Sequence, residues 1–441
     1  MTGNVIVAQS GGPSPVINNS LRGVIDACQA DRTTFGRIYG GWHGIEGILK
    51  EELLDISAQD AAEIALLETT PAAGAIGTCR YKLKENQTRD FNRVVEVFKA
   101  HDIGYFFYIG GNDSMDTANK ISKIAREQGL DLIATGVPKT IDNDVGDSEF
   151  KLIDHTPGYG SVARYWACLI QNANEENAGS CPADPVLVIQ MMGRKIGFIT
   201  AAARLADPQR EMPLQIYMPE SGLTIEQLAD NVNDELKRSG RCIVALSEGF
   251  EVGDLGAVKD AFGHIEFDAS KRTAQQIVVS YLNAKGLAAR GTARGQVSGC
   301  DQRDTSVFLS NVDLQEAYEV GEKAVEIAGK DGNGWMATIL REPGRKPARN
   351  GYAIGVAGGY AVRYDKVPLQ QVANSERAFP TKWLSANKID VTDDFIRYAR
   401  PLIGTKWVKI PLKKGIQRFA RFQPIFAEKK CPPYAPEAYE K

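Results

Sequence analysis

Two short apolar runs in this sequence each end in a loop with side chains suited to binding phosphate and a divalent metal. The first loop, GGNDS at 110–114, follows the run at 106–109, and the second, PKTIDND at 138–144, follows the run at 132–137. Apolar runs of this length, broken by Gly or Pro and followed by a helical pattern, are typical of buried parallel strands. Because ligands bind at the carboxyl ends of such strands, we expect both loops to open onto one crevice.

The second loop carries the most specific pattern. Asp142 and Asp144 are two residues apart, so in an extended segment they point the same way, and one can face a hydroxyl while the other faces a metal. Two carboxylates this close need a cation beside them, or one pKa rises. Lys139 or Mg²⁺ can supply the positive charge. The alternative interpretation is a turn rich in Asp and Asn.

Glycine pairs precede two of the expected helices. In GGNDS the glycines allow phosphate oxygens to approach the backbone N–H groups, and the acidic side chain just beyond can hold Mg²⁺. The turn after the first expected strand, SGGPSP at 10–15, likewise has two glycines and backbone N–H groups that can bind an anion, but it has no acidic side chain. The alternatives are a solvated loop capped by Asp and an ordinary strand-to-helix turn. No GxxxxGK[ST] occurs, so a P-loop NTPase is excluded.

Strand ends in the second half of the chain carry groups suited to a polyol phosphate. MMGR at 191–194 offers Arg194 for phosphate charge, and SEG at 247–249 offers Glu248 for sugar hydroxyls. Arg294 and Arg303 flank a later strand end and can clamp a second phosphate. Taken singly, such residues are also typical of polar strand ends and of the surface.

Composition limits the class of protein. The chain has 441 residues, a net charge of −3 and 43% hydrophobic residues, which gives no reason to expect a nucleic acid or a membrane surface as partner. The seven cysteines are scattered, with no CxxC pair, and this favours a reducing, cytoplasmic location without disulfides or a zinc site. The first residues are typical of a strand and not of a signal peptide. The sequence contains no run of 18 or more apolar residues, so we expect no transmembrane helix.

Strand and helix patterns alternate in two halves, which predicts an α/β protein with two doubly wound domains and the active site between them. We place the first boundary near Asp154 and expect the chain to return to the first domain after about Arg303. The phosphoryl-donor domain is then 1–153 with about 304–345 and the C-terminal helix. The acceptor domain is 154–303 with about 346–390, and 394–441 is a C-terminal extension.

Together these motifs resemble the phosphofructokinase family over roughly residues 4–365. The match consists of several motifs in one order: SGGPSPVINNSLRG, GTCR, GGNDS, PKTIDND, MMGR, SEG and RGQVSGCDQR. The resemblance implies two Rossmann-like domains of the phosphofructokinase fold, with the active site in the cleft between them. It also implies transfer of a phosphoryl group to the 1-hydroxyl of fructose 6-phosphate, with Mg²⁺ as cofactor and a homodimer or homotetramer as assembly.

The resemblance also implies roles for individual residues. Asp142 is similar to the family's proton acceptor and acts with Lys139, Asp113 and Thr140. The phosphoryl donor is contacted by Gly12, Arg80, Gly111 and Lys139, and the metal lies beside Asn112 and Asp144. The residues expected to hold fructose 6-phosphate are Thr140, Ile141, Asp142, Met192, Gly193, Arg194, Glu248, Arg294, Cys300 and Arg303. Of these, Arg294 resembles an arginine that reaches the 6-phosphate from a neighbouring subunit.

Two of these positions indicate the donor. ATP-using members of the family have glycine where this chain has Asp113 and Lys139. An aspartate and a lysine fill the space that a nucleotide needs, and the lysine can bind pyrophosphate, so the chain resembles the pyrophosphate-dependent branch. The alternative at these positions is a local salt bridge. The alternative functions are an ATP-dependent phosphofructokinase and a non-catalytic subunit that binds a sugar phosphate.

Three positions depart from the family pattern. Asn112 stands where most members have an aspartate associated with Mg²⁺, and Cys300 replaces a common histidine at the sugar-phosphate site. Asp26 occupies the approximate position of an effector-binding arginine in regulated bacterial enzymes, which argues against the same control by nucleotide or phosphoenolpyruvate.

Overall fold

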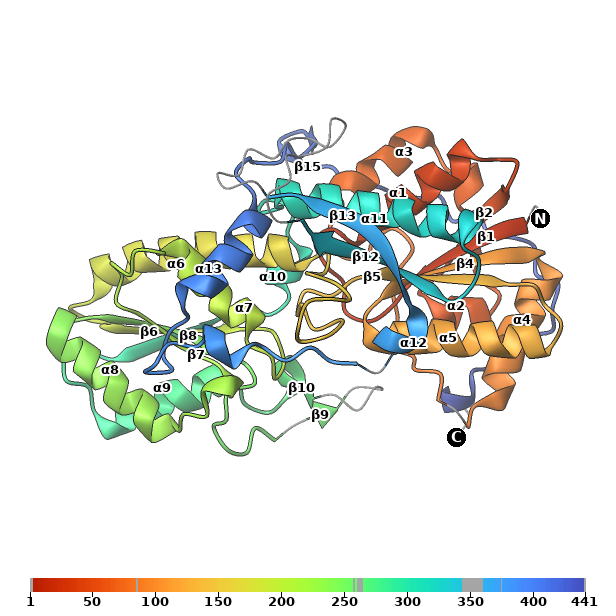
Figure 1. Cartoon of the computed structure of the whole chain (residues 1–441). Helices are drawn as coiled ribbons and strands as arrows, with labels where there is room; N and C mark the ends of the chain where they lie inside the picture. The colour runs from red at the N-terminus through yellow and green to blue at the C-terminus, as the bar shows by residue number, and fades with distance from the viewer. Residues whose placement is uncertain are drawn as a thin grey trace.

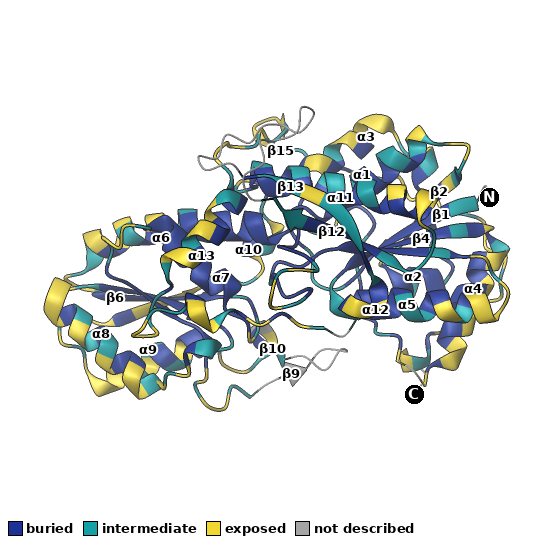
Figure 2. Cartoon of the chain, viewed as in Figure 1, coloured by how far each residue is buried: buried dark blue, intermediate teal, exposed yellow. Residues whose placement is uncertain are grey.

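The computed structural model describes residues 3–84, 86–256, 258–259, 265–342, 360–373 and 375–439. In this part of the chain, two large sheets lie side by side, each covered by helices on both faces (Figure 1). Among the described residues, no helix has both the length and the apolar character needed to cross a bilayer. Figure 2 shows that the burial is greatest along the inner strands of both sheets.

The larger sheet contains both apolar runs identified in the sequence. Its strands, in spatial order, are β13 (Val362–Pro368), β12 (Trp335–Arg341), β5 (Ile133–Pro138), β4 (Ile103–Gly110), β1 (Gly3–Gln9), β2 (Phe35–Gly41) and β3 (Leu53–Asp55). All neighbours are parallel except the two edge pairs, β12 with β13 and β2 with β3. The carboxyl ends of β1, β4 and β5 therefore lie together at one edge, as the sequence predicts.

Successive side chains of β1 point to opposite faces of the larger sheet, and this explains why helices cover both faces. Val5 and Val7 pack on one face against the helices at 17–30 and 311–330, whereas Ile6 and Ala8 pack on the other face against the helices at 88–100 and 112–127. The helices around this sheet are α1 (Ile17–Ala30), α2 (Ile45–Leu49), α3 (Ala61–Ala65), α4 (Thr88–Ala100), α5 (Asn112–Glu127), α11 (Asn311–Lys330) and α12 (Leu369–Val372).

The smaller sheet is parallel throughout, in the order β11 (Ala293–Val297), β6 (Val186–Met191), β8 (Cys242–Ser247) and β7 (Leu214–Tyr217). Its helices are α6 (Tyr159–Ser180), α7 (Phe198–Ala201), α8 (Ile225–Ser239), α9 (Ala274–Lys285), α10 (Asp301–Asp304) and α13 (Asp393–Ala399). Two short hairpins pair β9 (Val258–Lys259) with β10 (Ile265–Glu266) and β14 (Leu412–Lys413) with β15 (Ile416–Gln417).

The C-terminal third of the chain is distributed differently from the sequence-based expectation. We assigned about 346–390 to the second domain, but β13 belongs to the larger sheet because it pairs with β12 along its whole length. We also expected the C-terminal helix in the first domain, but Phe395 of α13 packs in the core beside the smaller sheet. Residues 343–359 lie outside the described residues.

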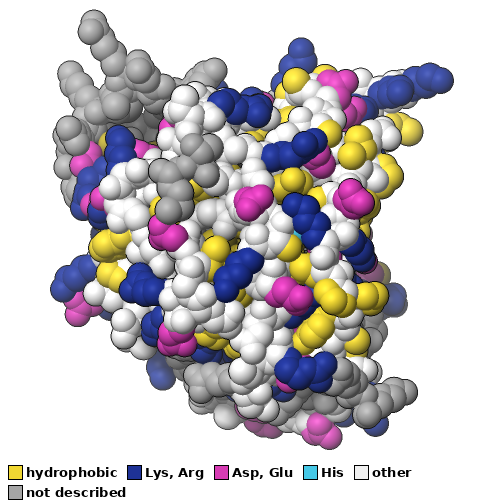
Figure 3. Space-filling view, turned by 90° about the vertical axis from the view of Figure 1, so that its right-hand side faces the viewer, with side chains coloured by type: hydrophobic (Ala, Val, Ile, Leu, Met, Phe, Trp, Pro, Cys, Tyr) yellow, Lys and Arg dark blue, Asp and Glu magenta, His cyan; other side chains and the backbone are white. Residues whose placement is uncertain are grey.

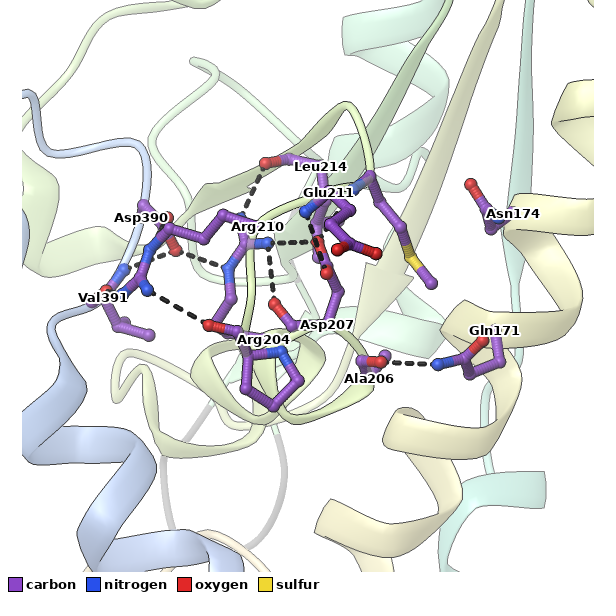
Figure 4. A network of polar contacts seen from close by, with 12 residues as sticks. Gln171, Asn174, Arg204, Ala206, Asp207, Arg210, Glu211, Leu214, Asp390 and Val391 are labelled. Atoms are coloured by element: carbon purple, nitrogen blue, oxygen red, sulfur yellow. Dashed lines mark hydrogen bonds and ion pairs between the residues drawn. The ribbon is translucent and has the colours of Figure 1, made fainter.

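A buried arginine attaches the segment before α13 to the smaller sheet (Figure 4). Arg204 donates from Nε to Asp390 at 2.8 Å, from Nη1 to Asp207 at 3.0 Å and from Nη2 to the carbonyl oxygen of Leu214 at 2.9 Å. Arg210 adds a bond to the carbonyl oxygen of Val391 at 2.9 Å. A buried guanidinium needs such partners, so this contact fixes the segment firmly.

Figure 3 shows the end of the molecule that carries the larger sheet. Lysine and arginine side chains are interspersed there with aspartate and glutamate, and neither sign gathers into a continuous patch on the described surface of this face. This mixed surface agrees with the net charge of −3.

Candidate active site

A cavity of about 440 Å³ opens where the carboxyl ends of β1, β4 and β5 face the loops of the smaller sheet. It brings together most of the residues expected from the sequence. The expected residues that line it are Gly12, Arg80, Gly111, Asn112, Asp113, Lys139, Thr140, Ile141, Asp142, Asp144, Met192, Arg194, Glu248, Cys300 and Arg303. Loops from distant parts of the chain therefore meet around one space.

Lys139 lies at the floor of this cavity. Its side chain is buried, with 4% exposed, and Nζ donates to the carbonyl oxygen of Gly12 at 2.6 Å. Burial is the main reason that its pKa is lowered to about 7; Asp142 opposes this shift, and Arg194 and Arg303 add to it. An incoming anion would favour the ammonium form, so the site is suited to a strongly charged phosphate.

Because Gly12 has no side chain, the guanidinium groups of two arginines can approach its backbone. A Cβ placed on it would lie 2.9 Å from Nη1 of Arg303 and 4.0 Å from Nη2 of Arg80. The preceding Gly11 has φ of 74°, a conformation that a side chain would strain. The turn at Gly11 and Gly12 is thus surrounded by positive charge. Arg303 was expected at the sugar phosphate, but its guanidinium here reaches the side of the turn while also contacting Sγ of Cys300 at 3.1 Å.

The loop with Asp142 and Asp144 is not the extended segment that the sequence analysis assumed. Asn143 between them has φ of 58°, because its side chain accepts from the N–H of Thr156 and donates to the hydroxyl of Tyr398. Both carboxylates nevertheless line the cavity. Burial and the nearby Asp142 raise the pKa of Asp144 to about 7, which marks it as a carboxylate that needs a cation.

The GGNDS segment also differs in detail from the expectation. We expected Asn112 and Asp113 in a loop, but α5 begins at Asn112, because the carbonyl oxygen of Gly111 already accepts from Ser114 and Met115. The first turn of α5 therefore faces the cavity, and its N–H groups favour an anion. Asp113 is paired with Lys82, a residue that the sequence analysis missed, at 2.7 Å between Nζ and Oδ1.

The smaller sheet contributes the opposite wall. The N–H of Arg194 donates to Oε1 of Glu248 at 2.8 Å, and Nε of Arg194 lies 3.9 Å from Oδ2 of Asp142. Gly193 has φ of 125° and provides the turn that directs Arg194 to the cavity, although it is not one of the described lining residues. The geometry thus brings an arginine and a glutamate close to the loop with Asp142.

Arg294, which the resemblance assigns to the site of a neighbouring subunit, does not line the cavity of its own chain. It lies on β11, an edge strand, with 67% of its side chain exposed, and pairs with Asp184 at 2.8 Å. The cavity also has lining residues that the sequence analysis missed, which are Ser375, Glu376, Ile265, Phe267 and Ala269. They come from segments without a phosphate-binding pattern, so the sequence offered no signal for them.

The side-chain oxygens in the cavity are suited to a Mg²⁺ ion that is bound partly by the protein and partly by the substrate. No cluster of three or more His, Cys, Asp or Glu residues that could hold a metal occurs among the described residues. However, the buried Oδ1 of Asn112 has no hydrogen-bond partner in the described part of the chain, and Asp144 is a buried carboxylate. Mg²⁺ commonly takes one or two protein oxygens together with water and phosphate oxygens, so Asn112 and Asp144 fit this ion.

Comparisons with known proteins agree with this geometry. The family model described as "Phosphofructokinase" matches residues 4–328. A "Pyrophosphate--fructose 6-phosphate 1-phosphotransferase" of Halomonas elongata is 36% identical, over 98% of this chain and 99% of the relative. Crystal structures of a pyrophosphate-dependent phosphofructokinase from Marinobacter aquaeolei and one from Nitrosospira multiformis are each 33% identical. Their TM-scores are 0.82 and 0.84, over 98% of this chain and 99% and 100% of theirs.

Proposed function

The chain belongs to the phosphofructokinase family, and we propose that it transfers a phosphoryl group from pyrophosphate to the 1-hydroxyl of D-fructose 6-phosphate. The products are fructose 1,6-bisphosphate and phosphate. One phosphoanhydride is consumed and one phosphate ester is formed, so we expect the reaction to run readily in both directions and to serve glycolysis or gluconeogenesis.

The observation that carries this proposal is the buried Lys139 in contact with Gly12, beside the first turn of α5. An ammonium at this place neutralises a small dianionic or trianionic donor, and a charge-assisted hydrogen bond of this kind contributes roughly 1.5–3 kcal/mol. Lys139 and Asp113 also occupy space that a nucleotide would need. The full-length relatives carry the same donor in their names.

Asp142 is the proposed proton acceptor. It lies on the cavity wall between the donor turn and the loops of the smaller sheet, and its N–H is bonded to Oγ1 of Thr140 at 3.1 Å. In the proposed reaction it takes the proton of the 1-hydroxyl as the oxygen attacks the near phosphorus of pyrophosphate in line. Such general base catalysis contributes about 10²–10⁴-fold.

The negative charge that spreads over the transferring group has several partners. Lys139, Arg80 and the N–H groups of the turn at Gly12 and of α5 at Gly111 are placed for the donor phosphates. Mg²⁺, when bound, supplies a Lewis acid that neutralises phosphate charge, and Asn112 and Asp144 are the residues that would hold it. Asp113 keeps Lys82 at this end of the cavity.

Fructose 6-phosphate is proposed to bind between Thr140 and Ile141 of the loop after β5 and the opposite wall, where Met192, Gly193, Arg194 and Glu248 contact the sugar. Cys300 and Arg303 are proposed to lie toward its phosphate, with Arg303 also reaching the turn at Gly12. Arg294 does not line the cavity of its own chain, and its side chain is exposed and paired with Asp184. We propose that it serves the 6-phosphate site of a neighbouring subunit, in a homodimer or homotetramer. A cytoplasmic location and the division into a donor domain and an acceptor domain also remain proposals.

The experiment that tests the function is a parallel assay of two donors. Purified protein is given fructose 6-phosphate, Mg²⁺ and either pyrophosphate or ATP, and fructose 1,6-bisphosphate is measured through aldolase. We expect turnover with pyrophosphate and little with ATP. Turnover with ATP alone would indicate an ATP-dependent enzyme, and none with either donor would indicate a non-catalytic subunit.

The Asp142→Asn variant tests the proton acceptor in the same assay. We expect turnover to fall by about 10²–10⁴-fold while fructose 6-phosphate still binds, as measured by calorimetry. Asp131→Asn, at an exposed aspartate before β5, is the matched control and should behave as the wild type. Near-normal turnover of Asp142→Asn would refute the assignment.

A further inference from the structure

The C-terminal segment, which the family resemblance does not explain, continues the larger sheet beyond its edge strand β3. Leu54 and Phe426 form an antiparallel bridge, flanked by hydrogen bonds from the N–H of Asp55 to Ile425 and from the N–H of Ala427 to Leu53. These bonds are 2.8 Å and 2.9 Å long. The segment is thereby guided along the sheet toward the start of α4, and Figure 1 shows the C-terminal end of the chain near that helix.

Buried charged groups then hold the backbone of this segment. Glu51, with 1% exposed, accepts from the N–H groups of Lys430 and Cys431 at 2.6 Å and 3.0 Å, and also bonds His101. Arg93 donates to the carbonyl oxygen of Pro432 at 2.9 Å. A buried carboxylate without these donors would be costly, so the segment is part of the folded core and not a loose end.

Asp90 at the start of α4 and Glu437 near the end of the chain bind each other reciprocally. Oδ1 of Asp90 accepts from the N–H of Glu437, and Oε1 of Glu437 accepts from the N–H of Asp90, both at 3.1 Å. The hydroxyl of Tyr434 donates to the same Oδ1 at 2.7 Å. Asp90 is fully buried, so the C-terminal residues supply most of the donors that its carboxylate needs.

Tyr81 is the side chain on which these contacts converge. Its hydroxyl bonds Oδ2 of Asp90 and accepts from the N–H of Ala438 at 3.2 Å, and its ring makes an edge contact with Tyr439 at 5.7 Å between centroids. The chain neighbours of Tyr81 face the active site, because Arg80 lines the cavity and Lys82 pairs with Asp113. The buried Tyr81 thus lies directly behind the donor end of the cavity.

We propose that residues 434–439 are a positioning element of the pyrophosphate site, which fixes Tyr81 and thereby the backbone that presents Arg80 and Lys82. Tyr434 and Glu437 act through Asp90 and Tyr81 and touch no substrate. The inference rests on the proposed function, which assigns this end of the cavity to pyrophosphate. It gives the C-terminal extension a part in donor binding and none in the binding of fructose 6-phosphate.

The test uses steady-state kinetics of the full chain with both substrates varied. In Tyr434→Phe and Glu437→Ala, we expect the KM for pyrophosphate to rise about tenfold, because a small misplacement of a phosphate-binding group is costly. We expect kcat and the KM for fructose 6-phosphate to change by less than about twofold, since the opposite wall is untouched. In Glu437→Gln the amide oxygen still accepts from Asp90, so this variant should be close to the wild type.

Arg418→Ala is the matched control within the same segment. Arg418 binds Glu63, upstream of the contacts with Asp90, so its loss loosens the segment without touching Tyr81. We expect unchanged KM values for both substrates. Circular dichroism of each variant checks that it is folded. If Tyr434→Phe does not fold, the comparison of Glu437→Ala with Glu437→Gln still tests the proposal.

Two results would overturn the inference, and they differ from failure of the proposed function. An unchanged KM for pyrophosphate in both Tyr434→Phe and Glu437→Ala would contradict it, and so would equal rises for both substrates, which indicate a general loss of structure. If the wild type itself gives no turnover with pyrophosphate, the proposed function has failed and the inference falls with it.

Discussion

Nζ of Lys139, on the loop after β5, donates to the carbonyl oxygen of Gly12, on the loop after β1, at 2.6 Å. The strands before these loops are separated in the sheet by β4, so the contact crosses its carboxyl edge. The lysine therefore closes the space next to the first turn of α5 and places a positive charge where a phosphate would enter. We propose that this contact governs donor choice, because the resemblance to the family implies that a nucleotide would need the space that Lys139 fills.

Replacing both ionic groups by glycine tests this account of donor choice. In the variant Asp113→Gly/Lys139→Gly we expect kcat/KM for pyrophosphate to fall by about 10- to 100-fold, since a charge-assisted contact is lost. We expect kcat/KM for ATP to rise, because space for the nucleotide is opened. Steady-state assays with each donor measure both values.

Lys123→Ala is the control for a lost lysine, because Lys123 is exposed on α5 away from the cavity. It should leave both values unchanged. If the double glycine variant keeps the wild-type preference for pyrophosphate, the two side chains do not select the donor.

Asn112 offers a second test, at the proposed metal site. Its Oδ1 is a buried acceptor without a partner in the described chain, so a carboxylate at the same place can meet Mg²⁺ with a full charge. In Asn112→Asp we expect the Mg²⁺ concentration for half-maximal turnover to fall by about threefold or more, and in Asn112→Ala we expect it to rise. Titration of activity with Mg²⁺ at fixed pyrophosphate gives these values. Identical titrations for all three proteins would place the metal elsewhere.

A buried histidine behind the loop with Asp142 gives a prediction for stability. His155 bonds Asp154 through Nδ1 at 2.9 Å and Glu316 through Nε2 at 2.7 Å, while Arg341 and Tyr360 bind the same carboxylates. Burial lowers the pKa of His155, but Glu316 and Asp154 outweigh this effect and raise it to about 9. The folded state therefore binds the proton more tightly than the unfolded chain, whose histidine pKa is about 6.5.

The sign of the effect follows from this difference. The stabilisation by protonated His155 is complete below about pH 6.5 and is lost as the pH rises through about 9, a loss of roughly 3 kcal/mol. We expect the free energy of unfolding in urea to fall between pH 6 and pH 9.5 in the wild type and to fall less in His155→Gln. His43→Gln, at an exposed histidine, should keep the wild-type slope. Equal slopes in all three proteins would contradict this role of His155.

The sequence predicted the parts of this protein that depend on local pattern. The strands that end at Gly110 and Pro138 are confirmed, and so is the α/β fold with parallel sheets. Parallel strands bring their carboxyl ends together, which is why the loops at 110–114 and 138–144 could be assigned to one cavity. The more distant loops were assigned to it through the resemblance to the family.

The parts that the sequence did not predict depend on long-range pairing. Lys82 has no motif around it, and only the fold brings it to Asp113. Strand β13 follows a segment without a strong pattern and is fixed by its pairing with β12. The left-handed conformation of Asn143 likewise follows from its bonds to Thr156, 13 residues further along the chain, and to Tyr398, 255 residues away.

The most direct test of the central claim, that pyrophosphate is the phosphoryl donor, is the reverse reaction followed by phosphorus NMR. The protein is incubated with Mg²⁺ and fructose 1,6-bisphosphate, together with either phosphate or ADP. We expect a pyrophosphate signal with phosphate and no ATP signal with ADP. Formation of ATP from ADP, without pyrophosphate from phosphate, would contradict the account.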